Sequence, residues 1–309
     1  MTRPTLSLLV PNFGELYPID GWRGLLDLAR AADAAGIDRL VVVDHVVMGE
    51  NLDAYQWGRF PTTPDAPWLE PLTVLSAMAA VTERVRLGTG ILIAPLRPAA
   101  VLAKTAATLD VLSGGRLDLG VGPGWQREEY DAVGRDFRRR GRLLDETLAA
   151  CTALWSEGSA AYDVDGTQVT DIWCRPAPQQ PGGVPFWIGG ELHRRNLDRV
   201  VRFGRGWIPI MGASLDDIAA GTATIRAALA AAGRDPDDVT VRAPLPMVRG
   251  DAGIDLDRSL AAVPEVLASG ARDVHVSLTA LAHDPGEAAE RLPWLVDRFA
   301  AVVGAGAAP

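Results

Sequence analysis

The sequence predicts an α/β fold in which eight strands, each followed by helical sequence, form a (β/α)8 TIM barrel. Short apolar runs alternate with longer amphipathic stretches along the 309 residues, a pattern typical of parallel strands joined by helices. Eight such units match the number in a barrel, which can use the whole chain, 1–309, as one domain. A doubly wound open sheet gives the same alternation, so the pattern alone leaves both folds open.

The boundaries of the elements follow from apolar runs, helix caps and breakers. Asp20 is the expected N-cap of the first helix, Gly36 ends it, and Pro98 lies in the first turn of the third helix. Strands are expected at 6–10, 40–43, 85–93, 117–121, 185–188, 207–210, 239–248 and 273–278. Helices are expected at 20–35, 72–81, 98–111, 127–133, 140–155, 192–203, 215–232, 256–268 and 287–303.

Two insertions interrupt this rhythm, one after the second strand and one after the fourth. Residues 47–68 and 156–183 are longer than ordinary connections and are rich in Pro and Gly or in aromatic and polar residues. In a barrel, the segment 47–68 would lie over the carboxyl ends of the strands. We therefore expect it to form a lid over the active site.

Composition and charge exclude several classes of partner. The net charge of −9 argues against broad binding to nucleic acid or to anionic membranes. Cys151 and Cys174 have no metal-binding or redox spacing, which predicts two buried, reduced thiols, and no histidine pair suggests a metal site. The first residues lack the layout of a signal peptide, and no apolar run of transmembrane length occurs, so a cytoplasmic protein is expected.

The candidate catalytic pair is Asp44-His45, which directly follows the second predicted strand. On a barrel, both side chains lie at the rim formed by the carboxyl ends of the strands, where active sites occur. His45 is suited to exchange a proton there, and Asp44 is suited to orient it or to bind a ring nitrogen. A purely structural Asp–His pair that ends the strand is the alternative.

Glycine-rich segments end three of the predicted strands. Residues 87–94 read LGTGILIA, where glycines indicate a bulge or a close approach by a planar ring. Residues 120–125 read GVGPGW, which misses the spacing of a dinucleotide-binding motif. Gly189-Gly190 precedes a helix whose first N–H groups could bind phosphate, or it forms only a tight turn.

Other charged residues carry weaker predictions. The arginines at 138–140 and 142 are expected on a solvated helix face. His275 alternates with Val274 and Val276 in the eighth strand, which places it inside the barrel or in a pocket.

Several longer stretches together form a pattern typical of one family. Residues 109–125 read LDVLSGGRLDLGVGPGW and are followed by Glu128-Glu129. Supporting stretches are VVVDHVV at 41–47, RVRLGTGILIAPLRPAAVLAKTAATLD at 84–110, PFWIGG at 185–190 and GRGWIPI at 204–210. Together these stretches resemble the luciferase-like monooxygenase family, and most of all its actinobacterial branch that uses coenzyme F420, a deazaflavin. The resemblance runs from the second to the sixth strand and implies the barrel rather than the open sheet.

The resemblance also implies roles for individual residues. Asp44 and His45 would lie beside the reactive edge of the ring, and Gly90–Ile91 would be a cis peptide bond that supports the ring from behind. The implied cofactor-binding residues are Thr89, Gly90, Ile91, Gly122, Gly124, Trp125, Glu128, Gly189, Gly190, Glu191 and His193, the last four toward the phosphate. Glu191 and His193 stand where many members of the family carry small or hydroxyl residues.

The function implied is a coenzyme F420-dependent oxidoreductase that transfers a hydride between the ring and a small organic substrate. The alternative is an FMN-dependent monooxygenase that uses reduced flavin and O2. A third possibility is a flavin-binding barrel without catalysis, in which Asp44 and His45 would lie away from the ring. Family analogy alone implies a homodimer.

Overall fold

Eight parallel strands close into a barrel in the computed structural model, which describes residues 3–17, 21–251, 253–282 and 284–305. Pairing of β3 with β5 joins the two ends of the sheet, which confirms the barrel and excludes the open doubly wound sheet. The barrel strands are β1 (Thr5–Leu9), β2 (Arg39–Val42), β3 (Arg86–Thr89) with its continuation β4 (Leu92–Ile93), β5 (Leu117–Gly122), β8 (Phe186–Gly189), β9 (Gly204–Ile208), β10 (Thr240–Pro244) and β13 (Asp273–Ser277).

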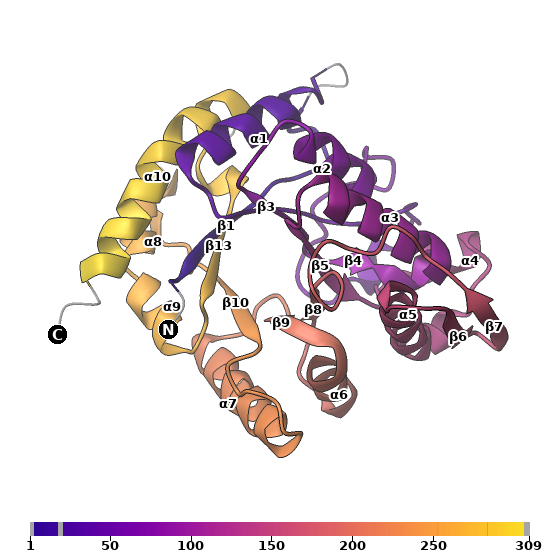
Figure 1. The fold of residues 1–309 in the computed structure, drawn as a ribbon. Coiled ribbons are helices and arrows are strands. Elements are labelled where there is room, and N and C mark those ends of the chain that lie inside the picture. The colour runs from indigo at the N-terminus through magenta and orange to yellow at the C-terminus, as the bar shows by residue number, and fades with distance from the viewer. Residues whose placement is uncertain (1–2, 18–20, 252, 283, 306–309) are drawn as a thin grey trace.

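Helices surround the barrel, and the apolar core lies between them and the strands (Figure 1). Outward-facing strand residues such as Leu8, Leu40 and Val276 are fully buried in this layer, and each contributes about 1.5–3 kcal/mol through burial. The helices are α1 (Gly24–Ala35), α2 (Pro71–Ala79), α3 (Ala99–Leu112), α4 (Arg127–Ala132), α5 (Arg140–Trp155), α6 (Arg194–Phe203), α7 (Leu215–Ala231), α8 (Leu256–Leu260), α9 (Val263–Ala268) and α10 (Pro285–Ala305).

The structure corrects the expected bounds of five elements, one of which is the strand expected at 207–210, observed as Gly204–Ile208. The strand expected at 85–93 is interrupted at Gly90–Ile91, and the one expected at 239–248 ends at Pro244, before the short strands β11 (Arg249–Gly250) and β12 (Gly253–Ile254). The helix expected at 256–268 is two helices, because Pro264 lacks an N–H and so fits the first turn of a new helix. The first helix begins at Gly24 with Arg23 as its N-cap, and Asp20 lies outside the described residues.

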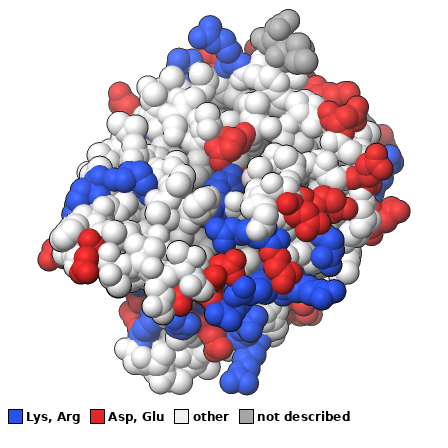
Figure 2. All heavy atoms as spheres, turned by 90° about the vertical axis from the view of Figure 1, so that its right-hand side faces the viewer, with Lys and Arg blue, Asp and Glu red and all other residues white. Residues whose placement is uncertain are grey.

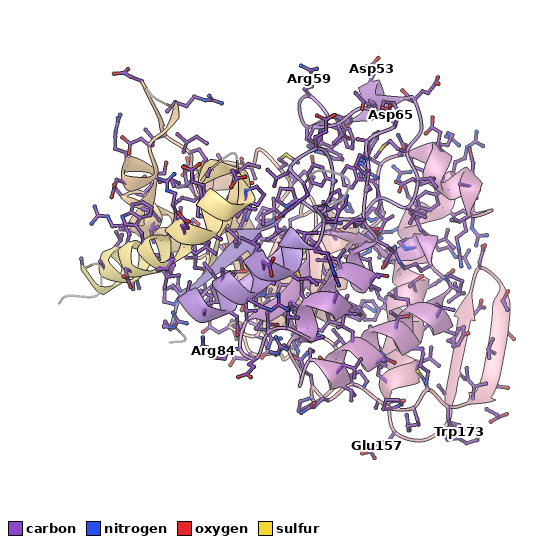
Figure 3. All side chains as sticks on the ribbon, turned by 90° about the horizontal axis from the view of Figure 1, so that it is seen from above. Asp53, Arg59, Asp65, Arg84, Glu157 and Trp173 are labelled. Atoms are coloured by element: carbon purple, nitrogen blue, oxygen red, sulfur yellow. The ribbon has the colours of Figure 1, made fainter. Side chains whose placement is uncertain are left out.

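The two insertions lie at opposite ends of the barrel (Figure 3). Asp53, Arg59 and Asp65 mark the loop after β2 at one end, and Glu157 and Trp173 mark the other insertion at the far end. The latter contains the antiparallel hairpin of β6 (Ala160–Val164) and β7 (Thr167–Ile172). Only the loop after β2 is therefore placed to cover the carboxyl ends of the strands.

Candidate active site

His45 lies at the carboxyl end of β2, where a carboxylate from another element orients its ring. The Nδ1 atom is 3.1 Å from Oε2 of Glu129 in α4, and the Oε1 atom of Glu129 accepts a hydrogen bond of 2.9 Å from the Val46 N–H. The Glu129 side chain is fully buried. Among the described residues, the Nε2 atom of His45 has no hydrogen-bond partner, so this nitrogen remains available to a ligand.

Aromatic side chains enclose the His45 ring. The rings of Trp68, Phe60 and Trp125 meet it edge to face, with centroid distances of 4.6, 5.5 and 5.9 Å. Trp68 in turn stacks on Phe13 from the loop after β1, with centroids 4.2 Å apart. Only 9% of His45 is exposed. A proton at this imidazole is therefore largely shielded from bulk water.

The segment 47–68, called the lid below, reaches across the mouth of the barrel. Tyr55 packs edge to face on Phe60 and Trp125, with centroids 5.2 and 5.4 Å apart. Its hydroxyl lies 3.5 Å from the sulfur of Met211, which follows β9. Because β2 and β9 are on opposite sides of the closed sheet, this contact spans the opening, as expected for a lid.

Two buried amides fasten the ends of the lid region. Gln126 accepts a 2.9 Å hydrogen bond from the Gly49 N–H and donates one of 3.3 Å to the Gly49 carbonyl. At the other end, the Asn12 amide donates to the carbonyl oxygens of Val43 and Leu69, at 2.9 and 2.7 Å. Gln126 and Asn12 are both fully buried, so these contacts hold the lid close to the strands.

Asp44 is directed away from His45, into an ion pair. Its carboxylate accepts two hydrogen bonds from Arg97, at 2.7 and 3.0 Å, and one of 2.8 Å from the Ile93 N–H. Arg97 also donates to Glu70 at 2.7 Å. Asp44 thus fixes the segment after the Gly90–Ile91 bond, and Glu129, which the sequence analysis did not assign, orients His45. The only signal for Glu129 was its place in the Glu128-Glu129 pair.

The peptide bond between Gly90 and Ile91 is cis, as expected. The Ile91 side chain then packs against glycines of two other strands. A Cβ on Gly189 would lie 2.5 Å from Ile91 Cγ2, and one on Gly122 would lie 3.0 Å from Ile91 Cδ1. The Thr89 hydroxyl donates to the Gly120 carbonyl at 2.7 Å. Packing inside the protein therefore accounts for these glycines, and their contact with a ring remains a prediction.

The loop after β5 and the start of α4 bring three more predicted residues to the mouth. Gly124 has a φ of 70°, and a Cβ there would lie 2.8 Å from Ile93 Cγ2. Trp125 borders His45, as described above. Glu128 packs against Gly49 of the lid, and its Oε2 atom is buried without a hydrogen-bond partner among the described residues.

The predicted phosphate segment forms a turn and a helix start. Gly190 has a φ of 112°, which favours glycine, and the Asn196 amide donates to the carbonyl oxygens of Gly189 and Glu191. Exposed His193 is the N-cap of α6, because its Nδ1 atom accepts from the Asn196 N–H at 3.3 Å. The Glu191 side chain is exposed. His193 is thus engaged by the helix, and phosphate contact by these four residues remains a prediction.

Basic and acidic side chains are interspersed on the face of the molecule shown in Figure 2. Arg142 pairs with Glu146, and Arg139 pairs with Asp165 of the hairpin. Arg138 is exposed. Exposed Arg138 and Arg142 agree with the expected solvated face, whereas Arg140 is half-buried over the Phe137 ring.

The described part of the chain contains neither a metal-binding cluster nor a membrane-spanning helix. No group of three or more His, Cys, Asp or Glu side chains there could hold a metal ion. Among the described helices, none is long and apolar enough to cross a membrane. Cys151 and Cys174 are free and buried, as expected.

Comparison with known proteins identifies the family. The luciferase-like monooxygenase family matches residues 5–253. The chain belongs to this family. As a luciferase-like protein it shares its fold with the monooxygenase RslO1 from Streptomyces bottropensis, at a TM-score of 0.72 and 20% identity, over 96% of this chain and 99% of that one.

Two curated relatives align with part of the luciferase-like chain. It is 34% identical over 188 residues to an uncharacterized protein of Mycobacterium tuberculosis, covering 58% of this chain and 65% of that protein. It is 30% identical over 200 residues to the F420-dependent glucose-6-phosphate dehydrogenase of Amycolatopsis mediterranei, covering 63% and 56%. The alignments thus span about two thirds or less of these relatives' lengths.

Proposed function

We propose that the protein is an oxidoreductase that binds coenzyme F420 at the barrel mouth and exchanges a hydride between the deazaflavin ring and a small organic substrate. The observation that carries this proposal is His45, held by Glu129 with a free Nε2 atom inside an aromatic enclosure. Similarity to an F420-dependent dehydrogenase supports the choice of cofactor.

The residues at the mouth fit a ring that carries a phosphate side chain. The buried, unpartnered Oε2 atom of Glu128 is an acceptor, and deazaflavin and flavin rings both carry an N–H donor. At the start of α6, exposed Arg194 and Arg195 border an open surface hollow together with Asp198. Cationic side chains beside a helix N-terminus suit a phosphate. Glu128 would therefore hold the ring, and the start of α6 would hold the phosphate.

Each residue then has a separate task. When bound, the deazaflavin supplies the hydride chemistry, and the protein supplies position and electrostatics. The Nε2 atom of His45 gives or takes the accompanying proton, while Glu129 keeps the ring in one orientation. Asp44 positions the strand segment that follows Ile91, through Arg97 and the Ile93 N–H. Lid aromatics exclude water from the reacting atoms.

The test is anaerobic hydride transfer from reduced F420 to a panel of carbonyl and α,β-unsaturated compounds, followed by the absorbance of oxidised F420. His45→Ala is expected to lose about 10²–10⁴-fold in turnover, as for removal of a general acid–base group. Affinity for F420, measured separately, should change little. Turnover of the variant close to that of the wild type would remove His45 from the mechanism.

The second candidate is an FMN-dependent monooxygenase. The fold that the chain shares with the monooxygenase RslO1 supports this candidate. Oxygen uptake that depends on reduced FMN and a substrate would support it. Oxidation of reduced F420 by a substrate without oxygen would support the first candidate instead.

A further inference from the structure

Below the mouth, the interior of the barrel contains a network of buried charges. Arg39 donates to Asp118 at 2.8 Å and to Asp273 at 2.7 Å. Arg242 donates through Nε to Asp273 at 2.7 Å. At the amino end of the barrel, Arg86 makes two bonds of 2.7 Å with Asp118. All except Arg86 are buried.

The carboxyl groups of this network are charged. Burial opposes ionisation of Asp118 and Asp273, but the charge of Arg39 and the other arginines outweighs it and lowers the pKa of both carboxyl groups. Both are therefore ionised at neutral pH. The two buried guanidinium groups, of Arg39 and Arg242, match the two carboxylates in number. The third guanidinium, of Arg86, is partly exposed at the amino end.

The Arg242 side chain brings its charge beneath the predicted ring site. It starts on β10, which lies opposite β3 in the closed sheet. A Cβ on Gly90 of the β3 segment would lie only 3.7 Å from Arg242 Nη1. The Arg242 guanidinium lies over the Trp187 ring, 4.7 Å from the ring centroid. The Arg39 guanidinium lies 4.6 Å from the same centroid. The free end of Arg242 thus crosses the interior close to Gly90–Ile91.

The Arg242 guanidinium has N–H donors that form no hydrogen bond with the described residues. The described residues give the Arg242 guanidinium one hydrogen bond, from Nε to Asp273. Among the described residues, the buried His275 Nδ1 atom has no hydrogen-bond partner, and neither Nη nitrogen of Arg242 donates a hydrogen bond. His275 pairs in register with Ser7 and Pro244, one inward-facing position beyond Asp273 toward the mouth.

His275 is a neutral group in this network. Burial, and next the positive charge of Arg242, lower its pKa from 6.5 to about 4. At neutral pH the imidazole therefore adds no charge. It offers a nitrogen without any hydrogen-bond partner among the described residues, beside a cationic donor.

We propose that Arg242 and His275 form a binding site inside the barrel for an anionic oxygen group of a ligand that enters through the mouth. The two Nη groups would donate to the oxygen, and His275 would provide a neutral polar wall. The group could belong to the substrate, as a carboxylate, or to the cofactor, as an ionised oxygen on the edge of its ring. The choice between substrate and cofactor as the source of this group rests on the proposed function, but the existence of the site does not.

Bromide, an anion that can be located by anomalous scattering, tests the site without any cofactor. Crystals of the full chain grown in sodium bromide should show a peak within hydrogen-bonding distance of the Arg242 Nη atoms. The peak should disappear in Arg242→Gln and persist in Arg86→Gln, which removes a guanidinium from the same network at the amino end. A wild-type crystal without this peak, or a peak that survives in Arg242→Gln, would overturn the proposal.

A second variant tests the site even if Arg242→Gln fails to fold. His275→Leu leaves the guanidinium in place and removes the polar wall, so bromide occupancy should fall. Unchanged occupancy in His275→Leu would refute the part assigned to His275.

Titration with F420 and with FMN separates the two sources of the anionic group. If the ring supplies it, Arg242→Gln should weaken ring affinity by about 10-fold to 100-fold, and Arg86→Gln should not. If a substrate supplies it, ring affinity should stay unchanged while acetate competes with bromide for the site. Failure of both F420 and FMN to bind would count against the proposed function and leave the bromide result standing.

Discussion

Replacement of Arg97 by Met is expected to destabilise the mouth of the barrel strongly. The Asp44 side chain has no exposed surface, and that of Arg97 is 14% exposed. Burial opposes the charge of Arg97, but its hydrogen bond and attraction to Asp44 outweigh this and raise its pKa. Without Arg97, the described residues leave the buried carboxylate only the Ile93 N–H.

The expected cost is that of leaving one member of a buried ion pair unpaired, about 3–5 kcal/mol in the free energy of unfolding. Urea unfolding followed by circular dichroism measures it. The double variant Asp44→Asn with Arg97→Met should recover part of the loss, because the unpaired charge is gone. Arg142→Met, which breaks an exposed pair with Glu146, is the matched control and should change stability little. A loss below about 1 kcal/mol for Arg97→Met would refute the reasoning.

Three further predictions concern the lid, the buried imidazole and the barrel interior. Gln126→Ala should speed hydrogen exchange of the lid amides by roughly 5-fold or more, because it removes both hydrogen bonds between Gln126 and Gly49; unchanged exchange would contradict this. Between pH 6.5 and about 4, the unfolded chain protonates His275 while the folded chain does not, so wild-type stability should fall as the pH is lowered. His275→Gln should flatten that part of the curve, and an identical slope would count against the assignment. A Cβ on Gly206 would lie 2.1 Å from the Trp187 side chain. Gly206→Ala should therefore lower the free energy of unfolding by about 1–3 kcal/mol, as measured by thermal or urea unfolding. An unaltered midpoint would show that the indole moves freely.

Local sequence patterns predicted the barrel strands well because each strand contributes outward-facing residues to one apolar layer. Runs such as 40–43 carry that signal directly. The alternation could not decide between a closed and an open sheet, because closure depends on the pairing of β3 with β5. Bounds were wrong where one residue decides them, as at Pro264.

The sequence pattern could not predict which side chains contact one another in the folded candidate site. The neighbouring Asp44 was the natural choice to orient His45, yet Asp44 pairs with Arg97 and leaves this task to Glu129. The interior charges had a visible signal, since Asp118 and Arg242 each interrupt an apolar strand. Which of them pair follows only from the closed barrel.

Binding of a deazaflavin at the barrel mouth is tested most directly by calorimetric titration of the purified protein with F420 and with FMN. We expect F420 to bind with the lower dissociation constant and His45→Ala to retain this affinity. Tighter binding of FMN, or no measurable binding of F420, would contradict the proposed function.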